Sequence, residues 1–194
     1  MRYGELKRVT YETDISVDLD MDGTGKSNID TGIGFMDHML TLFSRHGIID
    51  LNVKAEGDLN VDYHHTVEDI GIVIGKCLAE ALNDKKGLKR YGTTFLPMDE
   101  TLVMVSIDIS GRPFLAYDCK IEADKVGEFD TELVEEFFRA VAFNGGLTIH
   151  VKLMYGKNAH HIIEAMFKAF GRALREAAST DPRVEGLMTT KGVI

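Results

Sequence analysis

The order of apolar and polar positions along the chain predicts two kinds of element. Residues 5–20 alternate polar and apolar side chains and end in Asp20-Met21-Asp22-Gly23, which is typical of a strand that runs into a turn. Residues 102–109 are apolar and rich in β-branched side chains, which also favours a strand. Residues 35–45 and 131–142 instead repeat apolar side chains at spacings of three and four residues, which predicts two amphipathic helices.

The same order of elements occurs twice. Glycines follow both short helices, at Gly47 and at Gly145-Gly146, where a helix is expected to stop. Each half then continues with a strand and a longer amphipathic helix: residues 49–55 and 64–83 in the first half, residues 147–153 and 159–178 in the second. Repeated strand–strand–helix–strand–helix units predict an α+β sandwich of two duplicated half-units, with helices packed on one face of each sheet.

The boundary between the halves is expected near residues 85–98, a connector rich in glycine and lysine. We therefore expect a first half at residues 1–90 and a second half at residues 91–180, which form one compact unit around a shared site. Residues 181–194 have little apolar periodicity, and we expect this C-terminal tail to be mobile until a ligand orders it.

Composition narrows the classes of function. The chain has 194 residues, of which 44% are hydrophobic and 27% charged, as is ordinary for a globular protein with a sizeable core. A net charge of -9 argues against a general role in binding nucleic acid or an anionic membrane, although it leaves room for a local basic pocket. No apolar run reaches the ~20 residues of a membrane span and no signal peptide is recognisable, so we expect a cytoplasmic protein. The two cysteines, Cys77 and Cys119, lack the spacing of a thiolate metal site and are expected to be buried thiols.

The sequence His-His-x-x-Glu occurs twice, as His64-His65-Thr66-Val67-Glu68 and as His160-His161-Ile162-Ile163-Glu164. Both copies open a predicted helix, where residues three and four apart share one face, so that each glutamate can reach the side of its histidines. Neighbouring histidines point ~100° apart on a helix, so the two of each pair can turn to different metals. Imidazole nitrogen and carboxylate oxygen are ligands of borderline divalent metals such as Mn, Fe, Co, Ni and Zn. The clusters therefore predict a paired-metal enzyme.

Two positions on the shorter helices extend these clusters. His38 lies on the apolar side of its helix, and its counterpart in the repeat is Glu136. A buried carboxylate without a partner is costly, so a metal or a histidine would account for both positions. His46, at a helix end, and His150, on a strand, are weaker candidates. The predicted ligand set is His38, His64, His65, Glu68, Glu136, His160, His161 and Glu164.

Basic residues at turns and helix faces are candidates for holding an anion. Arg112 lies in the tight turn Gly111-Arg112-Pro113, and Thr190 and Lys191 lie in the tail. Together with Arg90 and Lys168, such groups suit a phosphate. A basic side chain on a protein surface is more often a solvated charge, so the residues alone leave both interpretations open.

Three segments resemble the imidazoleglycerol-phosphate dehydratase family: Gly34 to Leu40, Asp62 to Asp69 and Asn158 to Ala165. Supporting matches are Thr10 to Thr13, Pro97 to Glu100, Ser110 to Pro113, Phe167 to Ala169 and Lys191 to Val193, so that the resemblance covers essentially the whole chain. One departure is Glu136, where some members of the family carry histidine.

The resemblance implies a ribosomal-protein-S5-domain-2-like sandwich, two manganese ions per active site and an assembly of 24 subunits with sites between subunits. It implies dehydration of D-erythro-imidazole glycerol phosphate to imidazole acetol phosphate in the biosynthesis of L-histidine. Two metals would hold the imidazolate by its two nitrogens as Lewis acids, while a carboxylate carries protons. We expect Glu12 to bind substrate and act as acid or base, with Glu164 as a ligand that also takes part. The residues expected to hold the phosphate are Arg90, Arg112, Lys168, Thr190 and Lys191. Asp99 and Glu100 are additional candidates near the imidazole, or else solvated acids.

Two other functions are compatible with the clusters. A metal-dependent hydrolase would use the same ligands to activate a bridging water against an ester or amide. A metal-storage or structural oligomer would use them to hold subunits together. The substitution Glu12→Gln separates the last alternative from an enzyme, because only an enzyme would lose turnover while retaining its metal.

Overall fold

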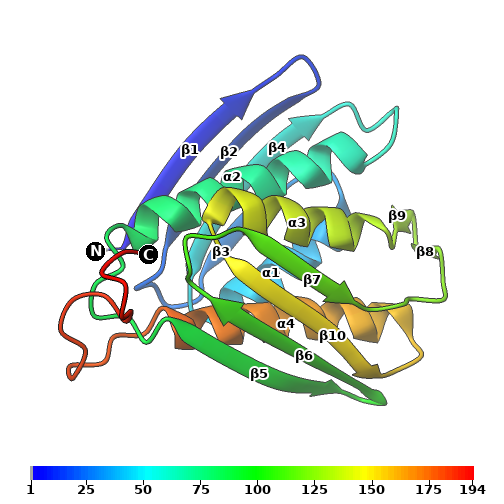
Figure 1. Ribbon diagram of the computed structural model, residues 1–194. Coiled ribbons are helices and arrows are strands. Elements are labelled where there is room, and N and C mark those ends of the chain that lie inside the picture. Colours follow the sequence, from blue (N-terminus) through cyan, green and yellow to red (C-terminus); the bar gives the residue numbers. More distant parts are fainter. Residues whose placement is uncertain (1) are drawn as a thin grey trace.

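The computed structural model describes residues 2–194 and places four helices between two four-stranded sheets (Figure 1). The strand order is β1-β2-β4-β3 in one sheet and β5-β6-β10-β7 in the other, which is the same order in two successive halves of the chain. In each sheet only the last pair is parallel, β3 with β4 and β7 with β10. The predicted α+β class and its duplication are therefore confirmed.

Each half supplies one sheet and two helices. The first half contains β1 (Tyr3–Val9), β2 (Thr13–Asp20), β3 (Ser27–Asp30), α1 (Gly34–Gly47), β4 (Asp50–Gly57) and α2 (His64–Leu82). The second half contains β5 (Tyr91–Met98), β6 (Thr101–Asp108), β7 (Phe114–Asp118), α3 (Leu133–Gly145), β10 (Thr148–Tyr155) and α4 (Ala159–Ala177). A short hairpin of β8 (Lys125–Val126) and β9 (Phe129–Asp130) precedes α3.

The strict alternation in β2 and β6 explains why these strands lie inside their sheets. Every second residue of each is buried, beginning with Thr13 in β2 and Thr101 in β6. Because successive side chains of a strand point to opposite faces, one face of each sheet packs against the helices and the other stays accessible.

The helices pair across the two halves. α1 packs against α4, and α2 packs against α3. A Cβ atom at Gly171 of α4 would lie 2.6 Å from the carbonyl oxygen of Phe43, and one at Gly75 of α2 would lie 2.8 Å from that of Val141. Side chains at these glycines would force the helices apart, so both close contacts depend on glycine at equivalent positions of the repeat.

The structure corrects several of the predicted boundaries. Residues 5–20 form most of the β1–β2 hairpin rather than one strand. Residues 85–98 are a connector only in part, because Tyr91–Met98 forms β5 and pairs with β6. The sequence pattern does not predict β3, β7 or the β8–β9 hairpin, since all four strands are short and lie outside the sheet centres. Short strands there need little apolar alternation.

Gly47 ends α1, but it is not the residue that turns the chain. Ile48 adopts the left-handed conformation, with φ 55°, whereas Gly146 does so after α3, with φ 63°. Gly47 lies at the close crossing with α4, where a Cβ at Gly171 would be 2.8 Å from its backbone nitrogen. Gly47, which the sequence pattern identifies only as a helix stop, is therefore also needed for the packing of α1 against α4.

The tail of residues 181–194 lies beside the segment that joins the two halves. The Gly87 N–H donates to the carbonyl of Gly186 at 2.8 Å. The Arg90 guanidinium donates through Nη1 to the carbonyl of Met188 at 2.7 Å. The tail backbone is thus tied to the start of the second half.

We propose that residues 1–90 and 91–180 are the two copies of the duplicated unit and that they fold together, because each helix packs against a helix of the other copy. Cys77 is buried as expected, but Cys119 is only half-buried. Among residues 2–194, no helix has the length and apolar character that crossing a membrane requires.

Candidate metal centre

The two histidine clusters lie at helix starts on the same end of the molecule. α2 and α4 both begin there, whereas the N- and C-termini lie at the opposite end (Figure 1). His64 is the first residue of α2 and His160 is the second residue of α4. Asn158 caps α4, because its Oδ1 accepts from the backbone N–H of His161 at 3.2 Å.

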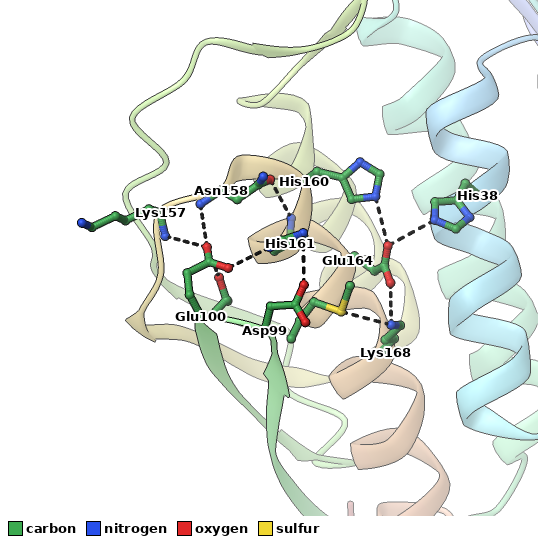
Figure 2. Close-up of polar contacts among 11 residues, drawn as sticks. His38, Asp99, Glu100, Lys157, Asn158, His160, His161, Glu164 and Lys168 are labelled. Atoms are coloured by element: carbon green, nitrogen blue, oxygen red, sulfur yellow. Dashed lines mark hydrogen bonds and ion pairs between the residues drawn. The ribbon is translucent and has the colours of Figure 1, made fainter.

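His38, His160 and Glu164 form the tightest cluster of candidate ligands. One atom of each lies within 4.8 Å of one atom of the other two, and within residues 2–194 no other three histidine, cysteine or acidic residues meet this condition. The Nε2 atoms of His38 and His160 lie 3.2 and 3.0 Å from Oε2 of Glu164 (Figure 2). Since His38 comes from α1 and the other two from α4, the helix pair that crosses between the halves builds this cluster.

Lys168 completes the surroundings of Glu164. Its Nζ lies 2.5 Å from Oε1 of Glu164, and only 9% of the Glu164 side chain is exposed. Burial alone would raise the pKa of this carboxyl, but the hydrogen bonds from Lys168 and the two imidazoles outweigh burial and lower the pKa to about 2. Glu164 is therefore a carboxylate at neutral pH, as a metal ligand must be. Lys168, predicted as a phosphate ligand, lies in this cluster.

His161 is oriented by a carboxylate on the β5–β6 turn. Its Nδ1 lies 2.7 Å from Oε2 of Glu100, and its Nε2 lies 3.6 Å from Asp99 (Figure 2). Oε1 of Glu100 accepts from the backbone N–H groups of Lys157 and Asn158, which lowers the pKa of Glu100 and ties the turn to the start of α4. When Nδ1–H donates to Glu100, Nε2 of His161 keeps its lone pair for a metal, the arrangement usual for ligand histidines.

His65 has a similar partner in the first half. Its Nδ1 lies 3.0 Å from Oδ2 of Asp58, in the turn between β4 and α2. Its Nε2 lies 3.8 Å from Oε1 of Glu12, at the tip of the β1–β2 hairpin. The Asp58 and Glu100 carboxylates raise the pKa values of His65 and His161. The sequence analysis missed Asp58, because no local pattern relates a turn residue to a histidine seven positions later.

A buried ion pair fixes the hairpin that carries Glu12. The Arg8 guanidinium of β1 donates to the buried carboxylate of Asp69, which follows Glu68 in α2. The hydroxyl of Thr13 donates to the same oxygen of Asp69 at 2.5 Å. Because both strands of the hairpin are bonded to α2, Glu12 is held next to His65.

The remaining predicted ligands are more open. His64 Nε2 lies 4.0 Å from Oε2 of Glu68, and 45% of the Glu68 side chain is exposed. Glu136 is not buried, as the sequence suggested: 33% of its side chain is exposed, and its Oε2 lies 3.7 Å from Nε of Arg139. The structure therefore brings three of the eight predicted ligands into one cluster, and all eight stay predictions as metal ligands.

Four of the five predicted phosphate ligands surround one cavity of about 620 Å³. They are Arg90, Arg112, Thr190 and Lys191, and the tail forms most of the wall. Arg90 is held there by Asp108, which accepts from its Nε at 2.7 Å. The backbone N–H of Arg90 donates to Ala177, the last residue of α4, whereas His160 is near the first. Seventeen residues of helix at 1.5 Å each separate this cavity from the metal cluster by about 25 Å.

The cluster of His38, His160 and Glu164 fits a divalent transition metal. Two imidazoles and a carboxylate are a donor set for Mn, Fe, Co, Ni or Zn, and the carboxylate is already ionised and buried between the two rings. His65 and His161 add imidazoles whose second nitrogen is bonded to a carboxylate.

Comparisons with known proteins all point to one family. A family model described as imidazoleglycerol-phosphate dehydratase matches residues 31–174. The chain is 62% identical to the imidazoleglycerol-phosphate dehydratase of Clostridium kluyveri over 194 residues, all of both chains. It is 60% identical to that of Acetivibrio thermocellus over 190 residues, 98% of this chain and 97% of the relative.

Two solved structures have the same fold. The crystal structure of imidazoleglycerol-phosphate dehydratase from Staphylococcus aureus has a TM-score of 0.84 and 50% identity, over 92% of this chain and 99% of that one. A structure from Pyrococcus furiosus, in complex with (S)-C348, has a TM-score of 0.84 and 41% identity, over 97% of this chain and 100% of that one.

Proposed function

The chain belongs to the imidazoleglycerol-phosphate dehydratase family, the hydro-lyases of histidine biosynthesis, and on that premise we propose how its residues carry out the reaction. The substrate is D-erythro-imidazole glycerol phosphate and the product is imidazole acetol phosphate. The observation that supports this most directly is the cluster of two imidazoles around the ionised Glu164. As a hydro-lyase of this family, the protein is neither the metal-dependent hydrolase nor the storage oligomer considered above.

We propose that two metal ions, manganese in the first place, are held by the eight predicted ligands. His38, His160 and Glu164 would form the core of one metal site. The remaining ligands of the two sites would be His64, His65, Glu68, Glu136 and His161. Once bound, the metals would supply positive charge to the two nitrogens of the substrate imidazole and so let the ring accept an electron pair.

The protein's own acids and bases then move protons. The hydroxyl on the carbon next to the ring leaves as water, and the neighbouring carbon loses its hydrogen as a proton. The resulting enol takes up a proton at the ring-side carbon and becomes the ketone, so that one water is lost overall. Glu12 is our candidate for the acid and base, because it lies at an exposed hairpin tip beside His65. Glu164 would take part as a metal ligand, and the ammonium of Lys168 would partly balance its negative charge.

The phosphate would be bound by Arg90, Arg112, Thr190 and Lys191, with Lys168 on the metal side. A small substrate cannot reach across the ~25 Å between the cavity and the metal cluster of one chain. We therefore propose that the cavity of one subunit serves the metal cluster of another in a homo-oligomer of 24 subunits. Exposed apolar side chains that are close in sequence to Glu12 and to the histidine clusters suit such an interface: Tyr11, Val61 and Tyr155. We propose a cytoplasmic location for this biosynthetic activity.

The reaction and its metal dependence can be tested together. Purified protein should convert synthetic imidazole glycerol phosphate to the ketone, lose this activity on chelation and regain it with Mn²⁺. The matched variant Glu12→Gln should retain Mn²⁺ but lose at least about 100-fold in kcat, as expected for a general acid and base. Chelator-insensitive turnover, or full activity of Glu12→Gln, would contradict the mechanism.

Subunit mixing tests the shared site. Arg90→Ala should damage only the phosphate cavity and His160→Ala only the metal cluster, so each variant should be inactive alone. When both are expressed together and assemble at random, about a quarter of the sites should combine two intact parts and regain activity. Mixed assemblies that stay inactive would show that one chain supplies both parts.

A further inference from the structure

The β8–β9 hairpin is an insertion in the second half. Three residues, 31–33, connect β3 to α1, whereas fourteen residues, 119–132, connect β7 to α3. Gly127 and Glu128 form the two-residue turn, with Gly127 at φ 58°, and the Thr131 side chain closes the base by donating to the carbonyl of Ala123 at 2.8 Å. The hairpin is thus a built element of the fold with no counterpart in the first half.

The hairpin reaches the metal cluster through two aromatic rings. Phe129 of β9 is buried, and its ring centroid lies 5.1 Å from that of Phe35 at the start of α1. The Phe35 ring in turn meets the imidazole of His160 edge-on, at 5.4 Å between centroids and 75° between planes. Both values are typical of a favourable edge-to-face contact.

His160 lacks the support that the neighbouring histidine has. Ligand histidines usually donate their second ring nitrogen to a carboxylate or carbonyl, as His161 does to Glu100. Within residues 2–194, the only hydrogen bond of the His160 ring is the one from Nε2 to Glu164. The Phe35 ring is therefore the apolar contact that restrains rotation of this half-exposed ring, whose other ring neighbours are the imidazoles of His38 and His161.

We propose that Phe35 is a positioning residue that keeps Nε2 of His160 turned toward Glu164, and that Phe129 of the hairpin acts on His160 through Phe35. Phe35 and Phe129 also line a cavity of about 420 Å³, together with His38, Tyr63, Val126 and Gly127. The hairpin thereby also forms one wall of the space beside the metal cluster. This inference rests on the proposed metal site, but its test reads metal binding separately from turnover.

The test compares Co²⁺ binding to the intact assembly of the wild type, Phe35→Leu, Phe129→Leu and the double variant, by calorimetry and by visible absorption. Phe35→Leu should weaken Co²⁺ binding about tenfold, the scale for losing the support of a ligand, and should change the absorption bands. Phe129→Leu should have a smaller effect. The double variant should bind no more weakly than Phe35→Leu, because non-additive effects identify residues that act through one contact.

Phe143→Leu is the control, because Phe143 is an exposed phenylalanine of α3 outside this aromatic chain. It should bind Co²⁺ as the wild type does, and melting temperatures of the metal-free proteins show that each variant folds. Phe35→Met, which keeps apolar volume without a ring, replaces Phe35→Leu if that variant does not assemble. Unchanged affinity and spectrum in the Phe35 variant, or additive effects of the two substitutions, would overturn the proposal. A wild type that binds Co²⁺ but does not dehydrate the substrate would contradict the proposed reaction alone, whereas a wild type that binds no Co²⁺ would overturn both.

Discussion

Both halves carry a His-His-x-x-Glu cluster, but the arrangement of its side chains differs. In the second half they lie close together (the gathered cluster), and in the first half they lie farther apart and more exposed (the open cluster). In the second, Glu164 lies between two imidazoles and an ammonium with 9% of its side chain exposed. In the first, Glu68 is 45% exposed and its nearest imidazole nitrogen, in His64, is 4.0 Å away. Both sit at equivalent turns of helices that cross their partners at equivalent glycines, Gly75 and Gly171, but α2 makes a further close contact at Gly71, where α4 has Phe167.

A second difference is the residue that the neighbouring helix presents to the glutamate. His38 on α1 offers a hydrogen-bond partner to Glu164, whereas the equivalent residue on α3 is Glu136. Two carboxylates repel each other unless a cation lies between them. Ile72 also stands where the second half has Lys168. The gathered cluster is therefore stable by itself, and the open one depends more on a bound metal.

Removing the carboxylate from each cluster should sharpen this contrast most. Both Glu164→Gln and Glu68→Gln should lower kcat/KM by at least about 100-fold, because each removes a proposed metal ligand. Only Glu164→Gln should also destabilise the metal-free protein, by about 1–3 kcal/mol, since it removes the charged acceptor of Lys168, whose side chain is only 16% exposed. Glu68→Gln should stay within about 0.5 kcal/mol. Urea unfolding of the metal-free proteins checks this, and equal destabilisation would refute the contrast.

Replacing the carboxylates that orient His161 and His65 should also affect the second half more than the first. Glu100→Gln should weaken Mn²⁺ binding by about 10–100-fold, and Asp58→Asn should do so toward the lower end of that range. Glu100 also accepts two backbone N–H groups at the start of α4, so its replacement disturbs the helix start as well. Titration calorimetry measures both, with the exposed Glu56→Gln on β4 as control. A stronger effect of Asp58→Asn would reverse the comparison.

Lowering the pH should release the metal by protonating the ligand histidines, and not by protonating Glu164. The pKa values of His65 and His161 are raised, so their ion pairs stabilise the metal-free fold below pH ~6.5 and are lost as the pH rises through the raised values. Metal needs the neutral rings. As the pH is lowered, occupancy should therefore begin to fall while the pH is still above ~6.5, by about tenfold per pH unit for each competing proton. Glu164, with its pKa lowered to about 2, stays ionised throughout this range. Metal content that is constant down to pH ~4 would argue against histidine ligands.

The smallest effect is expected from making the halves alike. Glu136→His gives the open cluster the residue type of the gathered one and should tighten Mn²⁺ binding a few-fold while activity is retained. Glu135→His is the matched control, because Glu135 pairs with Arg139 at 2.5 Å and is not a predicted ligand. If both variants bind alike, Glu136 is not a ligand, and the predicted set has seven members.

Which features of the fold and the site can be predicted from the sequence depends on how far apart in the chain the contacting residues lie. His-His-x-x-Glu fixes which side chains share a helix face, so Glu164 and His160 could be paired from spacing alone. The helix repeat also led to His38, because α1 packs against α4 as the duplication requires. Asp58 could not be found in this way, because a turn meets His65 only once the whole sheet is in place.

The site's surroundings were harder to predict for the same reason. One cavity is lined by the scattered residues Arg90, Arg112, Thr190 and Lys191, whose role as an anion site stays a prediction. The distance of this cavity from the histidines depends on the length and direction of α4. The hairpin with Phe129 has strands of two residues, too short to leave an alternating pattern. Glu136 was expected to be buried because its neighbours are apolar, yet its own side chain turns toward Arg139.

The pairing of helices across the halves has a consequence for the origin of the molecule. α1 with α4 and α2 with α3 are the contacts that two identical half-length chains would make in a two-fold symmetric dimer. Joining such chains end to end would free each copy to change without its twin. A histidine on one side and a glutamate on the other is a difference that a symmetric ancestor could not have encoded.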